Sequence, residues 1–547
     1  LKSPTSLLAT AKHFAAYGAA EAGRDYNTTD LSERTLREIY LPPFHAAVDE
    51  GVGSLMSAFN ALNGVPATAN AHLLDEILRK EWGFGGMVVS DFDAVEQLTA
   101  HGVAATPQEA AIKAIRVGVD MNMVDAAFTT LASAVREGKI EEAVIDRAVR
   151  RVLEAKANAG LFDEPLAIAG GEARATLLPA HREAARTVAE KAIVLLKNQD
   201  SLLPLKKDAR AIALIGPFLE ERDEMLGTWR AMGRGEDAVS ILEGIRREVS
   251  PATRVLHATG TGILDGTGEE IASAVAAAKQ ADVAIAFLGE GAHMSGEAQS
   301  RASLGLMGRQ QELLEALVAT GKPVVLVVMA GRPLTISWAA ERVPAIVYGW
   351  FLGVEAGNAL ANVLFGDVAP SGKLPVSIPR SVGQIPIYYN HLPTGRPAKA
   401  DDHYTSKYTD SPNDPLWPFG FGLSYTTFQY QDLRLSAPSM TEEQTLTVSA
   451  EVTNRGGRAG EEVVQLYLND PVAAVSRPVK ELKGFQRVAL GPGESRRVSF
   501  AITSDALRFW TSGGWTVEPG TFNVWIGPSS QDGLRGSFEL RPSSPRD

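Results

Sequence analysis

Residues 86–92 read GMVVSDF, a short apolar run that ends on an acidic residue, Asp91. Similar runs recur through the first 165 residues, and each is followed by a polar stretch long enough for a crossover helix. Short apolar strands that alternate with amphipathic helices are typical of parallel β/α units. The predicted strands are residues 8–14 (LATAKHF), 54–60 (SLMSAFN), 86–92 (GMVVSDF) and 118–123 (GVDMNM).

Four such units are half of a closed barrel. A (β/α)8-type barrel needs eight units and about 250 residues. We therefore expect residues 1–165 to form the second half of a barrel whose first half lies outside this sequence. Thr106 and Pro107 support the pattern, because a threonine cap followed by a first-turn proline predicts the helix before the fourth strand.

Two further domains are expected after a linker at 166–195, which leads from Gly170 and Gly171 into an alanine-rich helical run through Lys197. Residues 196–395 contain nearly continuous apolar runs separated by helical stretches, which predicts an α/β sandwich with a mostly parallel sheet buried on both faces. After a connecting segment at 396–431, residues 432–547 alternate apolar and polar side chains, which predicts a small antiparallel β-sandwich. We expect Trp510 and Trp515 to pack in the sandwich core or at the domain seam, and treat this domain as stabilising.

The composition limits the classes of function. With 45% hydrophobic and 22% charged residues among 547, and no run near ~18 apolar residues, the chain reads as globular, without a membrane helix. A net charge of -12 argues against nucleic-acid or anionic-membrane partners. There is no cysteine, and the nine histidines lack metal-ligand spacing, so we expect neither cofactor nor metal.

Asp91 follows a strand at the position where barrels carry their chemistry, the carboxyl ends of the strands. A strand holds such a carboxylate rigidly, which suits a nucleophile. The competing interpretation is an N-cap for the next helix, a common role for aspartate in such loops.

The loop after the predicted strand 283–288 contains two more acids, Glu290 and Glu297. Open α/β sheets bind ligands at this end of their strands. A carboxylic acid that donates a proton at neutral pH needs its pKa raised by burial or by a like charge, and Asp91 can supply that charge. Either glutamate can equally be a solvated loop residue.

Lys12 and His13 end the first predicted strand. Their N–H groups can hold the vicinal hydroxyls of a sugar by hydrogen bonds. A salt-bridged lysine and a core histidine remain alternatives.

At these residues the sequence resembles glycoside hydrolase family 3, and within it the bacterial periplasmic β-glucosidase branch. The resemblance implies a TIM-like barrel, an α/β sandwich and a C-terminal fibronectin type III-like domain. The segments that carry it are AKHFAAYG (11–18), SLMSAFNALNGVPAT (54–68), GFGGMVVSDFDAV (83–95), GEAQSR (296–301), SGKLPVSIPRSVGQIP (371–386) and PFGFGLSYTTF (418–428).

The same resemblance implies roles for individual residues. Asp91, in VVSDF, matches the family's nucleophile. Glu297, in GEAQSR, matches the general acid/base better than Glu290 does. The implied substrate-binding residues are Lys12, His13, Met56 and Phe92, with Arg24 and Tyr26 as weaker matches.

The implied activity is that of a retaining, exo-acting β-glycosidase, most simply a β-glucosidase. Glu297 would protonate the departing oxygen while Asp91 attacks the anomeric carbon, and the two carboxylates would lie ~5 to 6 Å apart. Because 206 positions separate them, two domains would have to build one site.

Several alternatives remain at this point. A β-xylosidase or arabinosidase of the same family differs only on one side of the sugar pocket. A carbohydrate-binding protein without turnover is the rival from another class. The N-acetylglucosaminidase branch is disfavoured, since Tyr17 replaces its histidine and no histidine occurs between His13 and His45. The expected partner is a small carbohydrate, the expected location is periplasmic or secreted as in the relatives, and a homodimer is left to test.

Overall fold

The computed structural model describes residues 7–163 and 177–542, and the chain divides into two compact units. Unit 1 comprises Leu1–Ala175 and Phe509–Trp515, and unit 2 comprises Thr176–Arg508 and Thr516–Asp547. Within the described ranges, no helix combines the length and the apolar character needed to cross a membrane.

Unit 1 is built on a four-stranded parallel sheet in the order β1-β2-β5-β6. Each predicted strand is present with a shorter extent, and the sheet is the expected run of β/α units. In the register Met56 lies beside Val89, so the carboxyl ends of the strands share one edge of the sheet. The strands are β1 (Thr10–Phe14), β2 (Ser54–Ser57), β5 (Met87–Phe92) and β6 (Met121–Met123), and a small hairpin is formed by β3 (Ala61–Leu62) and β4 (Val65–Pro66).

Helix α4 (Pro107–Val117) forms as the sequence predicts. The Thr106 hydroxyl accepts a hydrogen bond from the Glu109 N–H at 3.2 Å, and Pro107 occupies the first turn. Gly118 ends the helix with φ 112°, a left-handed conformation that favours glycine. The other helices of unit 1 are α1 (Glu33–Thr35), η3 (Leu36–Tyr40), α2 (Pro42–Asp49), η5 (His72–Glu81), α3 (Gln97–Ala100), α5 (Leu131–Arg136) and α6 (Glu142–Asn158).

Unit 2 contains a six-stranded sheet in the order β7-β12-β11-β10-β8-β9. All residues of β10 and β11 are buried, as expected for parallel strands between two helix layers. Two edge strands were not predicted: β7 pairs antiparallel with β12, and the apolar run of β9 is interrupted by exposed Arg254 and His257. The strands are β7 (Val194–Asn198), β8 (Ala211–Ile215), β9 (Arg254–Ala258), β10 (Val283–Gly289), β11 (Val324–Met329) and β12 (Ala345–Tyr348).

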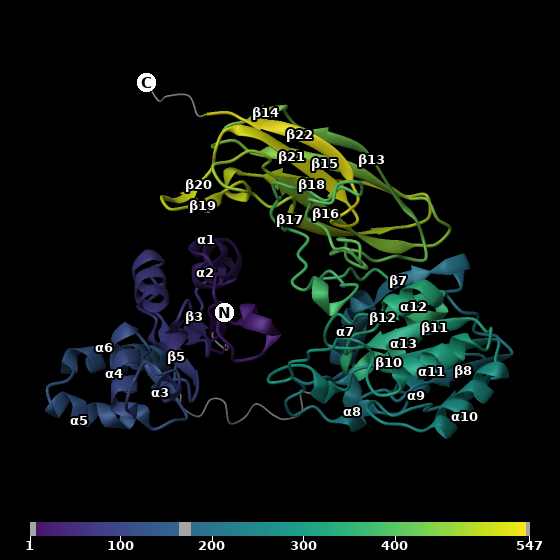
Figure 1. The fold of residues 1–547 in the computed structure, drawn as a ribbon, viewed down its shortest axis with the longest axis horizontal. Coiled ribbons are helices and arrows are strands. Elements are labelled where there is room, and N and C mark those ends of the chain that lie inside the picture. The colour runs from purple at the N-terminus through teal and green to yellow at the C-terminus, as the bar shows by residue number, and fades with distance from the viewer. Residues whose placement is uncertain (1–6, 164–176, 543–547) are drawn as a thin grey trace. The chain divides into compact units, whose positions relative to one another are not determined.

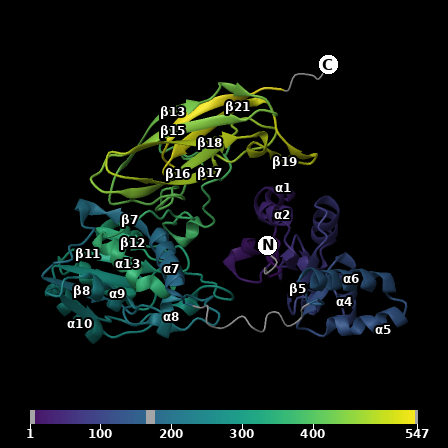
Figure 2. The ribbon, with the colours of Figure 1, turned by 180° about the vertical axis from the view of Figure 1, so that it is seen from behind.

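Helices cover both faces of this sheet (Figures 1 and 2). Buried residues of α7, α9 and α13 pack on one face, and those of α10, α11 and α12 pack on the other. The helices are α7 (Pro179–Ala192), α8 (Arg222–Met225), α9 (Ile241–Glu248), α10 (Gly268–Lys279), α11 (Gln310–Val318), α12 (Ser337–Arg342) and α13 (Ala356–Phe365).

The expected segment at 166–195 contains the predicted alanine-rich helix, α7, which ends at Ala192 rather than at Lys197. Residues 166–176 lie outside the described residues. Helix α7 belongs to unit 2, because its buried Ala189 joins the apolar core under α13. Its continuation, β7, is an edge of the sheet rather than part of the alanine-rich helix.

The C-terminal β-sandwich has a three-stranded sheet, β13-β15-β18, and a five-stranded sheet, β14-β22-β21-β16-β17. The alternating residues predicted to face the core, including Val448 and Phe500, are buried in one cluster between the sheets. The strands are β13 (Phe428–Leu435), β14 (Ser439–Met440), β15 (Leu446–Asn454), β16 (Gly460–Asn469), β17 (Glu481–Leu490), β18 (Ser495–Ile502), β21 (Gly520–Gly527) and β22 (Leu534–Leu540).

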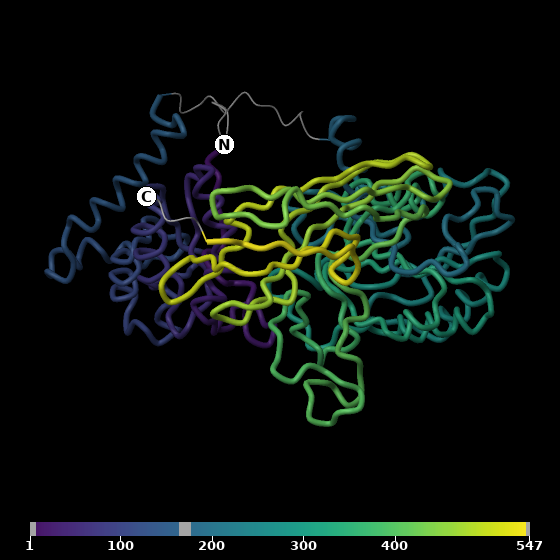
Figure 3. The backbone as a smooth tube through the Cα atoms, turned by 90° about the horizontal axis from the view of Figure 1, so that it is seen from above, coloured from purple at the N-terminus to yellow at the C-terminus, as the bar shows by residue number. Residues whose placement is uncertain are grey.

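A long irregular segment precedes the sandwich. Between η13 (Val382–Gln384) and β13, all residues are described and none belongs to a named helix or strand. In the tube view the chain near residue 400 extends away from the rest of unit 2 as an open loop (Figure 3). Residues 391–400 are exposed throughout, as expected for a connecting segment.

The hairpin formed by β19 (Phe509–Thr511) and β20 (Gly514–Thr516) excludes one of the two positions expected for Trp510, the sandwich core. Residues Phe509–Trp515 cluster with unit 1. The Arg37 guanidinium lies 4.4 Å from the centre of a Trp510 ring, and the Trp510 N–H donates to Glu38 Oε1 at 2.7 Å. Trp510 therefore packs on helices of unit 1 and not in the sandwich core.

Candidate active site

Asp91 lies at the carboxyl end of β5 and is 6% exposed. Its Oδ1 accepts a hydrogen bond from the Phe92 N–H at 2.8 Å, and its Oδ2 lies 3.4 Å from His13 Nε2. The next helix, α3, begins after Glu96 and has no side-chain cap. The N-cap interpretation of Asp91 is therefore wrong, and the carboxylate instead belongs to the strand-end edge of the sheet.

The other residues predicted for this edge are distributed around Asp91. His13 approaches it from β1, and its ring lies 5.1 Å from that of Tyr17. Met56 is buried on β2, whereas Phe92 is 53% exposed beyond the end of β5. Lys12 is exposed next to His13. The structure thus brings His13 against Asp91 and leaves Lys12 and Phe92 open to solvent.

An aromatic cluster beside His13 was not predicted as a unit. Tyr26 and Phe59 lie 5.3 Å apart between ring centres, and Tyr17 lies within 6.0 to 6.5 Å of both. Their spacing in the sequence shows no periodicity, because they come from separate loops. Only the weaker match of Tyr26 pointed to this cluster.

Strand β5 is anchored by a buried charge cluster around Asp120. Its Oδ2 accepts hydrogen bonds from the Val88 N–H at 2.9 Å and from Arg79 Nη2 at 2.7 Å. Its Oδ1 accepts from Arg151 Nη1 at 2.9 Å. Because the cluster is hydrogen-bonded to the backbone of the strand that ends in Asp91, it fixes the position of the nucleophile candidate.

The two glutamates of the loop after β10 have opposite environments. Glu290 is fully buried and forms ion pairs with Arg301 and with Arg332, whose Nε lies 3.1 Å from Glu290 Oε1. Glu297 is exposed on the same loop. Glu290 is therefore enclosed by two guanidinium groups and closed to solvent, whereas the side chain of Glu297 is accessible to a ligand. Of the two glutamates, only Glu297 lies at the surface of the loop.

Gly289 marks the start of this loop. Its φ is 148°, and a Cβ at this position would lie 1.8 Å from the Met329 carbonyl oxygen of the neighbouring strand. The following Glu290 N–H donates to the same oxygen at 2.7 Å. Only glycine permits this approach, which turns the chain out of β10 and directs Glu290 into the interior.

The network below Glu290 reaches Tyr348. The Tyr348 hydroxyl donates to the Arg332 carbonyl oxygen at 2.5 Å and accepts from the Leu334 N–H at 3.1 Å. Burial, opposed by the bond from Leu334 and reinforced by the Glu290 charge, raises the pKa of Tyr348 well above its ordinary value. The tyrosine is therefore a neutral support for Arg332 at all working pH values.

Trp229 is a candidate that sequence reasoning missed. It is 72% exposed, and a Cβ on Gly296 would lie 3.3 Å from its Nε1. The neighbouring Thr228 hydroxyl donates to the carbonyl oxygens of Ala292 and Ser295. An exposed indole next to the residue that precedes Glu297 can form a flat apolar surface for a ligand. Its only signal was an aromatic residue in a glycine-bounded loop.

Asp91 belongs to unit 1 and Glu297 belongs to unit 2. The fold of each unit accounts for the exposure and the contacts of the carboxyl group that it carries. In chemical terms, unit 1 supplies a buried, rigid carboxylate with a histidine beside it. Unit 2 supplies an exposed carboxyl group on a loop held by arginines.

Three family models match the chain. Residues 3–155 match the glycosyl hydrolase family 3 N terminal domain, residues 193–425 match the glycosyl hydrolase family 3 C-terminal domain, and residues 462–530 match a fibronectin type III-like domain. The three matches follow the barrel-type sheet, the α/β sandwich and the β-sandwich in order.

Relatives with assigned names match nearly the whole chain. A periplasmic beta-glucosidase of Salmonella typhimurium is 46% identical, over 98% of this chain and 74% of the relative. A beta-xylosidase of Formosa agariphila is 42% identical, over 96% of this chain and 74% of the relative.

Solved structures share the fold. The beta-glucosidase from Listeria innocua in complex with isofagomine superposes with a TM-score of 0.95 at 39% identity, covering 99% of this chain and 76% of that one. The same enzyme in complex with glucose gives a TM-score of 0.93 at 40% identity, covering 98% and 74%.

Proposed function

The chain belongs to glycoside hydrolase family 3, and from this premise we propose that it is a retaining, exo-acting β-glucosidase that releases glucose from the non-reducing ends of β-glucosides and β-gluco-oligosaccharides. The names of the Salmonella and Listeria relatives, and the glucose held by the Listeria enzyme, support glucose as the sugar. The observation that carries the proposal is Asp91, buried at the end of β5 with its carboxylate fixed between the Phe92 N–H and His13.

We propose Asp91 as the nucleophile and Glu297 as the general acid/base. In the first step Asp91 forms an ester with the anomeric carbon, the glycosidic C–O bond breaks, and Glu297 transfers its proton to the departing oxygen. In the second step Glu297 takes a proton from water, which attacks the anomeric carbon and releases Asp91. Two inversions leave the configuration retained.

The remaining candidates bind the sugar in this proposal. His13 and Lys12 donate hydrogen bonds to its hydroxyls, and Met56 provides an apolar wall from β2. Phe92 and Trp229, both exposed, suit the leaving-group side, where aglycones of different shape need an apolar surface.

The test is the rate of hydrolysis of 4-nitrophenyl β-glucoside by the parent chain and by Asp91→Asn. We expect the parent to hydrolyse it and the variant to lose at least about 1,000-fold in kcat, as when other nucleophiles are removed. Asp93→Asn, which changes an aspartate two positions away, is the matched control and should keep its rate. An Asp91→Asn variant at the parent rate would remove Asp91 from the mechanism.

β-Xylosidase activity is the second candidate, favoured by the 42% identity to the Formosa enzyme. The 4-nitrophenyl β-xyloside and β-N-acetylglucosaminide distinguish it. A higher kcat/KM on the xyloside than on the glucoside would identify xylose, not glucose, as the preferred sugar. Hydrolysis of none of the three 4-nitrophenyl glycosides would favour a binding protein without turnover.

The name of the Salmonella relative also supports a periplasmic or secreted location. Fractionation of the source cells tests it: activity in osmotic-shock fluid or medium supports export, and activity that follows cytoplasmic markers contradicts it. Light scattering of the purified chain decides whether it forms a homodimer.

A further inference from the structure

We propose that Glu290 is a positioning residue that holds the acid/base loop in its working conformation through Arg332 and Arg301. This inference rests on the proposed function of Glu297 and deepens it. Glu290 itself has no access to a substrate, since its side chain is fully buried. Its effect must therefore pass through the residues that it contacts.

Arg332 links Glu290 to the chain on both sides of Glu297. Its Nε pairs with the Glu290 carboxylate, while its Nη2 donates to the carbonyl oxygens of Met294 at 2.5 Å and Gln299 at 2.7 Å. Met294 precedes Glu297 and Gln299 follows it. A single planar guanidinium thus ties the two stems of the turn that presents Glu297.

Arg301 holds the same loop further along the chain. Its Nη1 pairs with Glu290, and its Nη2 donates to the Gly305 carbonyl oxygen at 2.9 Å. Both arginines are mostly buried, with side chains 11% and 20% exposed. Their charges require a buried partner, and Glu290 is the carboxylate that both contact.

Replacing Glu290 by glutamine keeps the volume but removes the charge that aligns both guanidinium groups. The amide also presents N–H donors toward them. We expect the arginines to turn away and the stems at Met294 and Gln299 to separate, which displaces Glu297. A misplacement of about 1 Å in a catalytic group can lower a rate by about 100-fold.

A misplaced proton donor has a kinetic signature that general unfolding lacks. A poor leaving group such as phenol needs protonation, whereas 2,4-dinitrophenolate departs without it. We expect Glu290→Gln to lower kcat/KM for phenyl β-glucoside by about 100-fold and to leave that for 2,4-dinitrophenyl β-glucoside close to the parent value. Glu297→Ala should show the same selectivity in stronger form.

Two further variants make the test specific. Arg332→Lys keeps a positive charge for Glu290, but one ammonium cannot replace the fork that reaches both carbonyl oxygens, so it should reproduce the selective loss. Glu341→Gln removes an exposed carboxylate from α12 of the same unit and should change neither rate. Trapping with 2,4-dinitrophenyl 2-deoxy-2-fluoro-β-glucoside, followed by mass spectrometry, counts the active molecules in each preparation.

The outcomes distinguish failure of the proposed function from failure of the positioning role. A parent chain that hydrolyses neither glucoside would overturn the proposed function and the positioning role with it. A parent that hydrolyses both, with Glu290→Gln and Arg332→Lys losing equal factors on the two substrates after correction for active molecules, would overturn the positioning role alone. If Glu290→Gln fails to fold, Arg332→Lys decides between these results.

Discussion

At the scale of single residues, Asp120 shows how a buried charge supports a strand that carries chemistry. Its side chain is 1% exposed, and Arg79 and Arg151 neutralise it. Burial lowers the pKa of Arg79, and the Asp120 charge opposes that change. Arg79 and Asp120 therefore each favour the charged form of the other inside unit 1.

We predict that Asp120→Asn lowers the free energy of unfolding of unit 1 by about 3 to 5 kcal/mol, because it leaves Arg79 buried without its counter-charge. The asparagine still fits and still accepts from the Val88 N–H. Urea unfolding monitored by hydrogen exchange in β5 measures the change. Glu141→Gln, at an exposed position of the same unit, should lie within about 0.5 kcal/mol of the parent. A loss below about 1 kcal/mol for Asp120→Asn would show that the cluster is dispensable.

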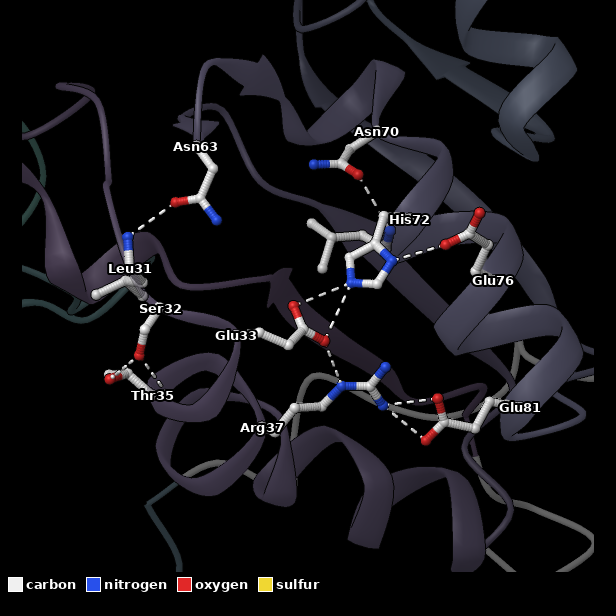
Figure 4. A network of polar contacts seen from close by, with 11 residues as sticks. Leu31, Ser32, Glu33, Thr35, Arg37, Asn63, Asn70, His72, Glu76 and Glu81 are labelled. Atoms are coloured by element: carbon white, nitrogen blue, oxygen red, sulfur yellow. Dashed lines mark hydrogen bonds and ion pairs between the residues drawn. The ribbon is translucent and has the colours of Figure 1, made fainter. Parts of the chain in front are cut away.

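At the scale of secondary-structure elements, a polar network joins α1, η3 and η5 (Figure 4). Glu33 accepts from Arg37 Nε at 2.7 Å and lies 3.1 Å from His72 Nε2, while Arg37 also contacts both oxygens of Glu81 at 2.6 Å. The other ring nitrogen of His72 lies 2.7 Å from Glu76. The helix η5 is thereby tied to the segment that begins at Glu33.

The pKa values of this network move in opposite directions. Burial lowers the pKa of His72, but its bonds to Glu76 and Glu33 outweigh burial and raise it above 6.5. Burial raises the pKa of Glu33, but Arg37 and His72 outweigh it and lower the value below 4.5. The contribution of His72 is complete below pH 6.5 and is lost as the pH rises through its folded-state pKa. That of Glu33 is complete above pH 4.5 and is lost on acidification.

We predict that the network stabilises unit 1 most between pH 4.5 and 6.5. His72→Gln should lower the melting temperature of unit 1 at about pH 5.5, and the difference from the parent should shrink by about pH 8.5. Because His72 and Glu33 are more than a third exposed, screening limits the effect to about 1 kcal/mol or less. Calorimetry at both pH values measures it, with His101→Gln as the control. A difference that grows with pH would contradict the assignment.

At the scale of the whole molecule, the chain crosses between the two units more than once. It passes from unit 1 to unit 2 after Ala175, returns for Phe509–Trp515, and leaves again at Thr516. Within unit 1, the Arg37 guanidinium lies over the Trp510 ring. The Trp510 carbonyl oxygen accepts a hydrogen bond from Arg34 Nε, and its backbone N–H donates to Glu38 Oε1. The hairpin therefore contributes to the stability of a unit from which it is distant in sequence.

We predict that Trp510→Ala speeds amide hydrogen exchange in residues 33–40 by about 2- to 30-fold, the range expected for losing a cation–π contact of about 0.5 to 2 kcal/mol. Exchange in β10 and β11 of unit 2 should not change. Mass spectrometry of peptides from native-state exchange measures both. Phe485→Ala, which removes an exposed aromatic side chain of β17, is the control. Unchanged exchange in residues 33–40 would mean that the contact adds no stability.

Local patterns predicted most of the fold. Strands β8, β10, β11 and β12 lie where continuous apolar runs occur, because residues buried on both faces must all be apolar. The edge strands β7 and β9 were not predicted, because a strand with an open edge or an exposed face need not be apolar along its whole length. Asp91 could be placed at a strand end for the same local reason, and the family motif added its chemical role as a prediction.

The sequence by itself determined the four central strands of the α/β sheet, the class of each domain and the family, because periodicity and short motifs are properties of neighbouring residues. Only the tertiary structure decided that Glu290 is enclosed by Arg301 and Arg332 while Glu297 stays exposed, and that Trp510 packs on Arg37. Those outcomes depend on which side chains meet across long separations in the chain. Burial and ion pairing between residues far apart in the chain cannot be recognised from the pattern of neighbouring residues.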